Sequence, residues 1–330
     1  MPDTDLIDPD AICASGTMTA AEAAALRRNY YKDGIISEDE ANALFAIEQS
    51  CKAAPAAWGP LFVEALTDYI VHQVKPTGYV TAGNASWLIE RISNGGKINS
   101  RNAFDLLVAV LNEARWAPAA LSVLALGQVR DAVVSGKGPL RTGVKPALGA
   151  VNSTDVLALR AILFASGGDG NITVSRAEAE VLMDIQDAAD ENLSDPGWID
   201  LYVKAIANHL MAASGFAPPS REVALRQEAW LTAEPSLAGF FSDMVHAGLA
   251  GIREAYQVPS AEQAELARLE DYKRAILVDE EITAPETKWL AGRINRDGRI
   301  SEAEHALLSF IKANSPKIDP ALDQLMAGVA

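Results

Sequence analysis

The stretch NRDGRISEAE (Asn295–Glu304) carries oxygen-bearing side chains at intervals that a calcium ion can use. Calcium takes about six to eight oxygen ligands, and one twelve-residue loop supplies them from positions 1, 3, 5, 7, 9 and 12, with glycine at position 6. Setting Gly298 at position 6 places candidate ligands at positions 3, 5, 9 and 12: Asn295, Asp297, Ser301 and Glu304. Position 1 is Arg293, a cation where the metal needs an anion. With only two carboxylates, such a loop is expected to bind calcium weakly, with a Kd of about 10⁻⁴ to 10⁻³ M.

Three other segments repeat the pattern of a helix, a glycine-containing turn, a short extended residue and a capped helix. They are KDGIISEDE (Lys32–Glu40), NGGKINSRN (Asn94–Asn102) and GDGNITVSRAE (Gly168–Glu178). In the first and third, the side chains that could bind a cation are Asn29, Asp33, Ser37, Glu40, Asp169 and Glu178. The third runs two residues longer, and the second has lost its acids, with Asn102 at the glutamate position. The pattern is that of an EF-hand loop in which some ligand positions or the spacing have been lost.

The same residues also have a purely structural interpretation. Glycine takes a positive φ, isoleucine packs inward, serine caps the next helix, and glutamate three residues on closes a capping box. Both interpretations stay open on the sequence. The only cofactor that the sequence suggests is Ca²⁺ or another divalent cation, weakly bound, and no catalytic residue is expected.

Helical signals run along most of the chain. Ser153–Leu163 has a serine cap ahead of apolar residues three and four apart, and Ser37–Ile47 begins with a capping box. Alternating apolar and polar residues, which are typical of strands, are almost absent. The expected fold class is all-α.

Internal repeats predict how the helices are organised. Thr81–Ile98 aligns without gaps on Thr283–Ile300, with eight of eighteen positions identical. Glu40–Ile47 matches Glu178–Ile185 at four positions, and each is followed by a helix that begins with tryptophan. We therefore expect an internal duplication that superposes Trp58 on Trp198 and Trp87 on Trp289.

Domain boundaries follow from these repeats. The first helical domain should cover residues 14–136, a Gly/Pro linker residues 137–150, and the second domain residues 151–330. The second domain should carry a helical insertion at about 214–278, which has no counterpart in the first.

Composition excludes several classes of partner. The net charge of −16 argues against nucleic acid or an anionic membrane, because phosphates would be repelled. The start MPDTDLIDPD lacks the basic and apolar regions of a signal peptide, and the apolar stretch from Trp116 is too short to span a bilayer. With two cysteines and four scattered histidines, a disulfide framework or zinc cluster is not expected. A cytoplasmic location is expected.

Paired Asp-Gly-x-Ile-Ser-x-x-Glu turns inside a helical unit resemble the tellurite-resistance B (TerB-like) family. The resemblance covers residues 16–136 and 151–330 less the insertion, and EF-hand-like proteins share the motif. It implies a divalent-metal site at the acidic turns and a role in stress responses and membrane-associated protein complexes. Carried over to this chain, it points to Asp33, Glu40, Asp169, Glu178, Asp297 and Glu304. The turn around Gly96 departs from the pattern.

Two function classes follow. The first is a non-enzymatic helical scaffold or interaction protein, with a protein partner and acidic turns that bind a cation weakly. The second is an enzyme with an active site in the groove between the two halves. The sequence favours the first, because catalysis needs convergent polar groups and the helices offer mostly core residues and solvated faces.

Overall fold

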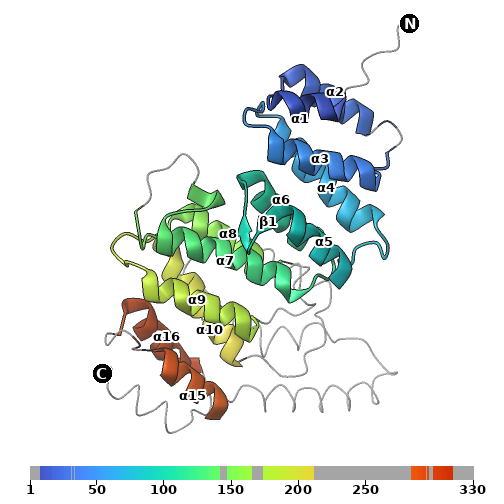
Figure 1. Cartoon of the computed structure of the whole chain (residues 1–330). Helices are drawn as coiled ribbons and strands as arrows, with labels where there is room; N and C mark the ends of the chain where they lie inside the picture. The colour runs from blue at the N-terminus through green and yellow to red at the C-terminus, as the bar shows by residue number, and fades with distance from the viewer. Residues whose placement is uncertain are drawn as a thin grey trace, which may run out of the picture. The chain divides into compact units, whose positions relative to one another are not determined.

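The computed structural model describes residues 8–30, 32, 34–141, 147–165, 174–211, 284–294, 296 and 300–314. Within them nearly all regular structure is helical, which confirms the all-α expectation (Figure 1). The insertion expected at about 214–278 lies outside the described residues. Contacts divide the chain into two compact units: Met1–Leu148 with Leu157–Gly170, and Gly149–Val156 with Asn171–Ala330.

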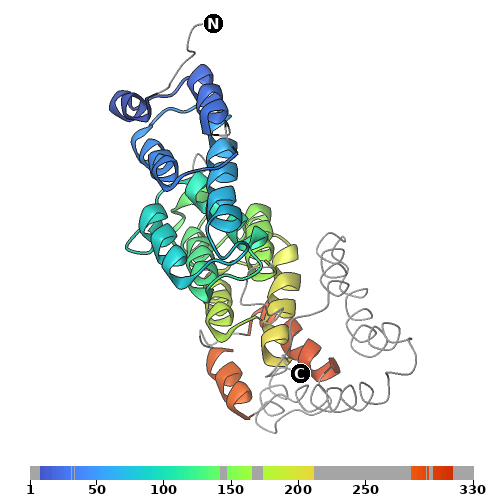
Figure 2. The same ribbon diagram turned by 90° about the vertical axis from the view of Figure 1, so that its right-hand side faces the viewer.

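The first unit is a bundle of short helices. Its elements are α1 (Pro9–Ser15), α2 (Ala20–Tyr30), α3 (Glu38–Ser50), α4 (Trp58–Thr67), the π-helix η1 (Asp68–Gln73), α5 (Ala82–Ile92), β1 (Ser93–Asn94), β2 (Lys97–Ile98), α6 (Arg101–Glu113), α7 (Ala119–Ser135) and the 3₁₀ turn η2 (Pro139–Arg141). Helix α4 packs against α3 and α6 (Figure 2). It buries Trp58 and Phe62, which together with Phe45 of α3 form a chain of contacting rings. These ring contacts hold α3, the helix that follows the first glycine-containing turn, against α4.

The hairpin β1–β2 explains the glycines of the second turn. Ser93 pairs with Ile98 and Asn94 with Lys97 in antiparallel register. Gly95 and Gly96 connect them at φ values of 57° and 77°, a left-handed region that favours glycine. This turn therefore reverses the chain tightly and directs Ile98 into the core.

The second unit is also helical and has fewer described elements. They are α8 (Ser153–Leu163), α9 (Arg176–Ala188), α10 (Gly197–Met211), α15 (Ala284–Arg293) and α16 (Glu302–Asn314); the contact division assigns the part of α8 from Leu157 onward to the first unit. Helix α10 packs against α9 and α16 and buries Trp198 and Tyr202 completely. Here again a tryptophan helix lies at the centre.

Two features concern the linker and the membrane. The expected Gly/Pro linker contains η2, whose three residues are buried and contact α6 and α7.

Among the described residues, no helix has the length and apolar character needed to cross a bilayer.

Candidate functional site

The first acidic turn ends in a complete capping box. Ser37 Oγ accepts a hydrogen bond from the Glu40 amide at 3.2 Å. In return, Glu40 Oε2 accepts bonds from the amide and the hydroxyl of Ser37, both at 2.8 Å. One oxygen of this carboxylate is thus already held by two protein donors.

The same box begins the helices after the third and fourth turns. Glu178 Oε2 accepts from the Ser175 amide and hydroxyl at 2.8 and 2.9 Å, and Glu304 Oε2 accepts from those of Ser301 at 2.8 and 2.9 Å. Both glutamates are buried. The structure places these two residue pairs, with Ser37 and Glu40, at helix starts and gives their glutamates a capping role.

Five candidate metal ligands remain after the residues of the three capping boxes. Asn29 lies in α2, and four candidates lie outside the described residues: Asp33, Asp169, Asn295 and Asp297. Within the described part of the chain, no three His, Cys, Asp or Glu side chains are grouped closely enough to hold a metal ion. Arg293, at position 1 of the fourth loop, donates from Nη2 to Asp184 Oδ1 of α9 at 2.7 Å. The guanidinium of Arg293 therefore forms an ion pair between α15 and α9.

The second turn differs from the sequence expectation by one residue. The N-cap of α6 is Ser100, whose Oγ accepts from the Ala103 amide at 3.1 Å. Counted from this cap, the third residue of α6 is Ala103, whereas the spacing from Gly96 places Asn102 at the glutamate position. Asn102 instead donates from Nδ2 to Glu48 Oε2 at 3.1 Å. The hairpin before α6 shifts the cap relative to the other turns.

A side-chain amide binds the extended residue of three turns. The amide of Ile36 donates to Gln73 Oε1 at 2.7 Å, that of Ile98 to Gln128 Oε1 at 2.9 Å, and that of Val174 to Asn208 Oδ1 at 2.7 Å. These acceptors satisfy backbone groups that would otherwise be buried without a partner. Sequence analysis missed all three, although an amide side chain on an apolar helix face was the available signal.

A polar network surrounds the buried tryptophan of the first unit. Trp58 Nε1 donates to Glu48 Oε2 at 2.6 Å, and Ser100 Oγ donates to Glu48 Oε1 at 2.6 Å. Glu48 of α3 thereby ties the start of α4 to the cap of α6.

The second unit contains the matching network. Trp198 Nε1 donates to Gln186 Oε1 at 2.7 Å, and Gln186 Nε2 donates to Ser301 Oγ at 3.3 Å. Gln186 of α9 thus links the start of α10 to the cap of α16, as Glu48 does in the first unit.

The second pair of tryptophans also has similar partners. Trp87 is half-buried; it contacts the Tyr69 ring, with the Arg91 guanidinium 4.0 Å from its ring centroid. Trp289 is buried and meets His209 edge to face, with the Arg176 guanidinium at 4.3 Å. Each unit therefore holds an aromatic and cationic cluster next to its tryptophan.

Burial, hydrogen bonds and charge pairing around Trp289 shift the pKa values of Glu180 and His209. Burial pushes the pKa of Glu180 up, but hydrogen bonds from Arg176 and Trp289 and the charge of Arg293 outweigh it, so this pKa lies below its ordinary value. Burial lowers the pKa of His209, whose Nδ1 donates to the Val174 carbonyl at 2.8 Å. These groups join helices α9, α10 and α15.

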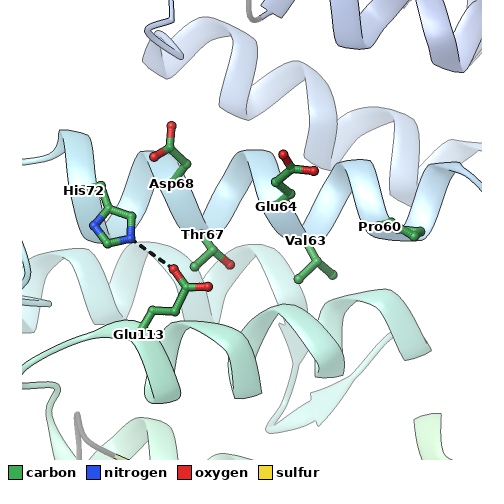
Figure 3. A pocket seen from close by; sticks show the side chains of 7 residues that line it. All are labelled: Pro60, Val63, Glu64, Thr67, Asp68, His72 and Glu113. Carbon is green, nitrogen blue, oxygen red and sulfur yellow. Dashed lines mark hydrogen bonds and ion pairs between the residues drawn. The ribbon is translucent and has the colours of Figure 1, made fainter.

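A groove lies on the surface of the first unit where α4 runs into η1, opposite the end of α6. Figure 3 shows its seven lining residues: Pro60, Val63, Glu64, Thr67, Asp68, His72 and Glu113. Glu113 reaches from α6 to His72, with 3.0 Å between Oε2 and Nε2. Three of the lining residues are carboxylates, none of which sequence analysis had selected.

Comparisons with protein-family models, curated proteins and solved structures found no match to this chain.

Replacing Ser175 by alanine should lower the free energy of unfolding by about 0.5–2 kcal/mol, because the first amides of α9 lose their acceptor. Ser175→Asp should retain most of the stability, since aspartate also accepts at an N-cap. Urea unfolding followed by circular dichroism measures both changes. Ser135→Ala, at the end of α7, is the control; equal stability of all three variants would contradict the capping role.

Proposed function

We propose that this chain is a non-enzymatic helical scaffold, made of two related units, in which the glycine-containing turns fix helix pairs. The observation that carries the proposal is the repeated capping box. In three turns the glutamate that would be the last ligand of a metal-binding loop instead accepts hydrogen bonds from the serine three residues earlier. A glutamate carboxylate that accepts these hydrogen bonds helps to keep the turn and the following helix rigid.

The internal duplication is part of this proposal. Support comes from the corresponding networks Trp58–Glu48–Ser100 and Trp198–Gln186–Ser301, which join corresponding helices. Further support comes from Trp87 and Trp289, which meet an aromatic ring at corresponding places on η1 and α10. An experimental structure in which the tryptophans of each pair occupy unrelated helix environments would reject the duplication.

A protein with a basic surface is the partner that we propose. The chain carries a net charge of −16, and complementary charge speeds association and selects partners. Affinity capture from a cell lysate, with chelator or with calcium, separates a scaffold from a calcium sensor. A scaffold should hold its partner in chelator and release it at high salt; release by chelator alone would indicate a sensor, and no specific capture would reject both.

We expect calcium binding to be weak, with a Kd of about 10⁻⁴ to 10⁻³ M. The physical reason is that Glu40 and Glu304 each already accept two hydrogen bonds on one oxygen, and these bonds compete with a bidentate metal contact. Isothermal titration calorimetry with calcium and magnesium measures this directly.

Three variants complete the calcium test. Asp33→Ala and Asp297→Ala remove the acid at position 5 of the first and fourth loops, and Asp39→Ala is a nearby acidic control. Binding tighter than about a micromolar, lost in either of the first two variants and kept in the control, would overturn the structural role of the turns.

A further inference from the structure

We propose that the groove on α4 and η1 binds an alkylammonium group, as carried by a lysine side chain or a free aliphatic amine. The inference depends on the groove, and only the comparison of Thr67 with Ala207 rests on the internal duplication proposed above. It starts from an unsatisfied hydroxyl. Thr67 is 2% exposed and lines the groove, yet its Oγ1 has no hydrogen-bond partner in the described structure. Leaving a buried hydroxyl unpaired is unfavourable, so such a group calls for an explanation.

The fold does not require this hydroxyl. Thr67 lies nine residues after Trp58 on α4, and Ala207 lies nine residues after Trp198 on α10. Ala207 is completely buried. An alanine therefore suits the same place on the corresponding helix, and the threonine oxygen is left for another purpose.

Charge decides the sign of the ligand. The lining contains Glu64, Asp68 and Glu113, with a single imidazole and no lysine or arginine among its seven residues. Glu64 already binds Arg27 through both oxygens, at 2.8 and 2.7 Å. The other two carboxylates each use one oxygen: Asp68 Oδ2 accepts from Gln73, and Glu113 Oε2 bonds with His72. The second oxygen of Glu113, Oε1, lies on the same side of α4 as Thr67 and is the acceptor that a cation would use (Figure 3).

The arrangement along the groove indicates a ligand with an apolar stem. Figure 3 shows Pro60 and Val63 towards one end, Glu113 and His72 at the other, and Thr67 between them. An alkylammonium group has a methylene stem for the first end and three N–H donors for oxygen acceptors at the second. A metal ion is less suitable, since these carboxylates form no group of three His, Cys, Asp or Glu that could hold one.

The test uses the full chain and n-pentylammonium chloride, with methyl NMR of Val63 and calorimetry as readouts. We expect saturable binding that Thr67→Val and Glu113→Gln each weaken by about tenfold, through loss of one hydrogen bond. Thr67→Ser keeps the hydroxyl, and Asp105→Asn alters an exposed acid on α6 outside the groove. Both should bind within about twofold of the unchanged chain.

Peptide and salt arms separate the sources of the cation. Acetyl-Gly-Lys-Gly-amide presents a lysine side chain and pentylammonium a free amine; binding of either one supports the proposal and identifies the source. The proposal is overturned if neither binds saturably, or if Thr67→Val and Glu113→Gln bind as the unchanged chain does. It is also overturned if calcium, sodium or the corresponding arginine peptide binds the groove equally well.

Discussion

Replacing Lys204 by methionine should lower the free energy of unfolding by about 3–5 kcal/mol. Lys204 Nζ lies 2.7 Å from Asp200 Oδ2, and the two side chains are only 6% and 5% exposed. Removing one partner of a buried ion pair takes away the compensation that it gave to the other buried charge. The stability lost by removing one partner is therefore much larger than the net stability that the intact ion pair contributes.

A second substitution should recover most of this loss. The double variant Asp200→Asn, Lys204→Met removes both charges of the pair, so its stability should approach that of the unchanged chain. Urea unfolding gives the free energy, and hydrogen exchange of α10 localises the effect, since a chain of two units need not unfold in one step.

The control is a pair with the same spacing at the surface. Arg101 and Asp105 also lie four residues apart, 2.8 Å from each other, with side chains 46% and 41% exposed. Arg101→Met should change stability by only about 0–1 kcal/mol, because water screens the pair. If Lys204→Met cost no more than Arg101→Met, the pair in α10 would not be desolvated as described.

Trp58→Ala should destabilise the first unit by about 3–5 kcal/mol. The indole is 2% exposed and packs on Phe62, so its removal leaves a large cavity. Glu48 also loses its closest donor on α4. Urea unfolding measures the loss, and hydrogen exchange of α3, α4 and α6 should show that these helices open first.

The smaller change to phenylalanine separates packing from hydrogen bonding. Trp58→Phe loses the bond to a carboxylate, whereas Trp198→Phe loses one to the neutral amide of Gln186. Charge-assisted hydrogen bonds are roughly twice as strong as neutral ones, so the first substitution should cost about twice the second. Equal costs would mean that the other donors of Glu48, Ser100 and Asn102, replace the indole.

Local chemistry explains why the helices and their caps could be predicted. A capping box joins residues three apart, as Ser37 and Glu40 do, so both partners are visible in one short stretch of sequence. The positive φ of Gly95 and Gly96 is similarly local. For this reason residue types and spacing alone predicted the all-α class, and they offered capping as one of two interpretations of the serine–glutamate pairs.

The groove depended on tertiary structure. Glu113 meets His72 across 41 residues of sequence, and no spacing rule relates an acid at the end of α6 to a helix that precedes α5. The buried state of Thr67 likewise depends on the packing of α4 against other helices.

The sequence by itself indicated where α3, α9 and α16 begin, because caps and turns satisfy backbone groups within a few residues. Tertiary structure decided which polar side chains complete the turns. Gln73, Gln128 and Asn208 bind amides 37, 30 and 34 residues away, and Glu48 joins helices that are distant in sequence. The physical reason is that a buried amide takes whichever acceptor the packed helices bring near it, and the chain has many such side chains that would look equally suitable before folding.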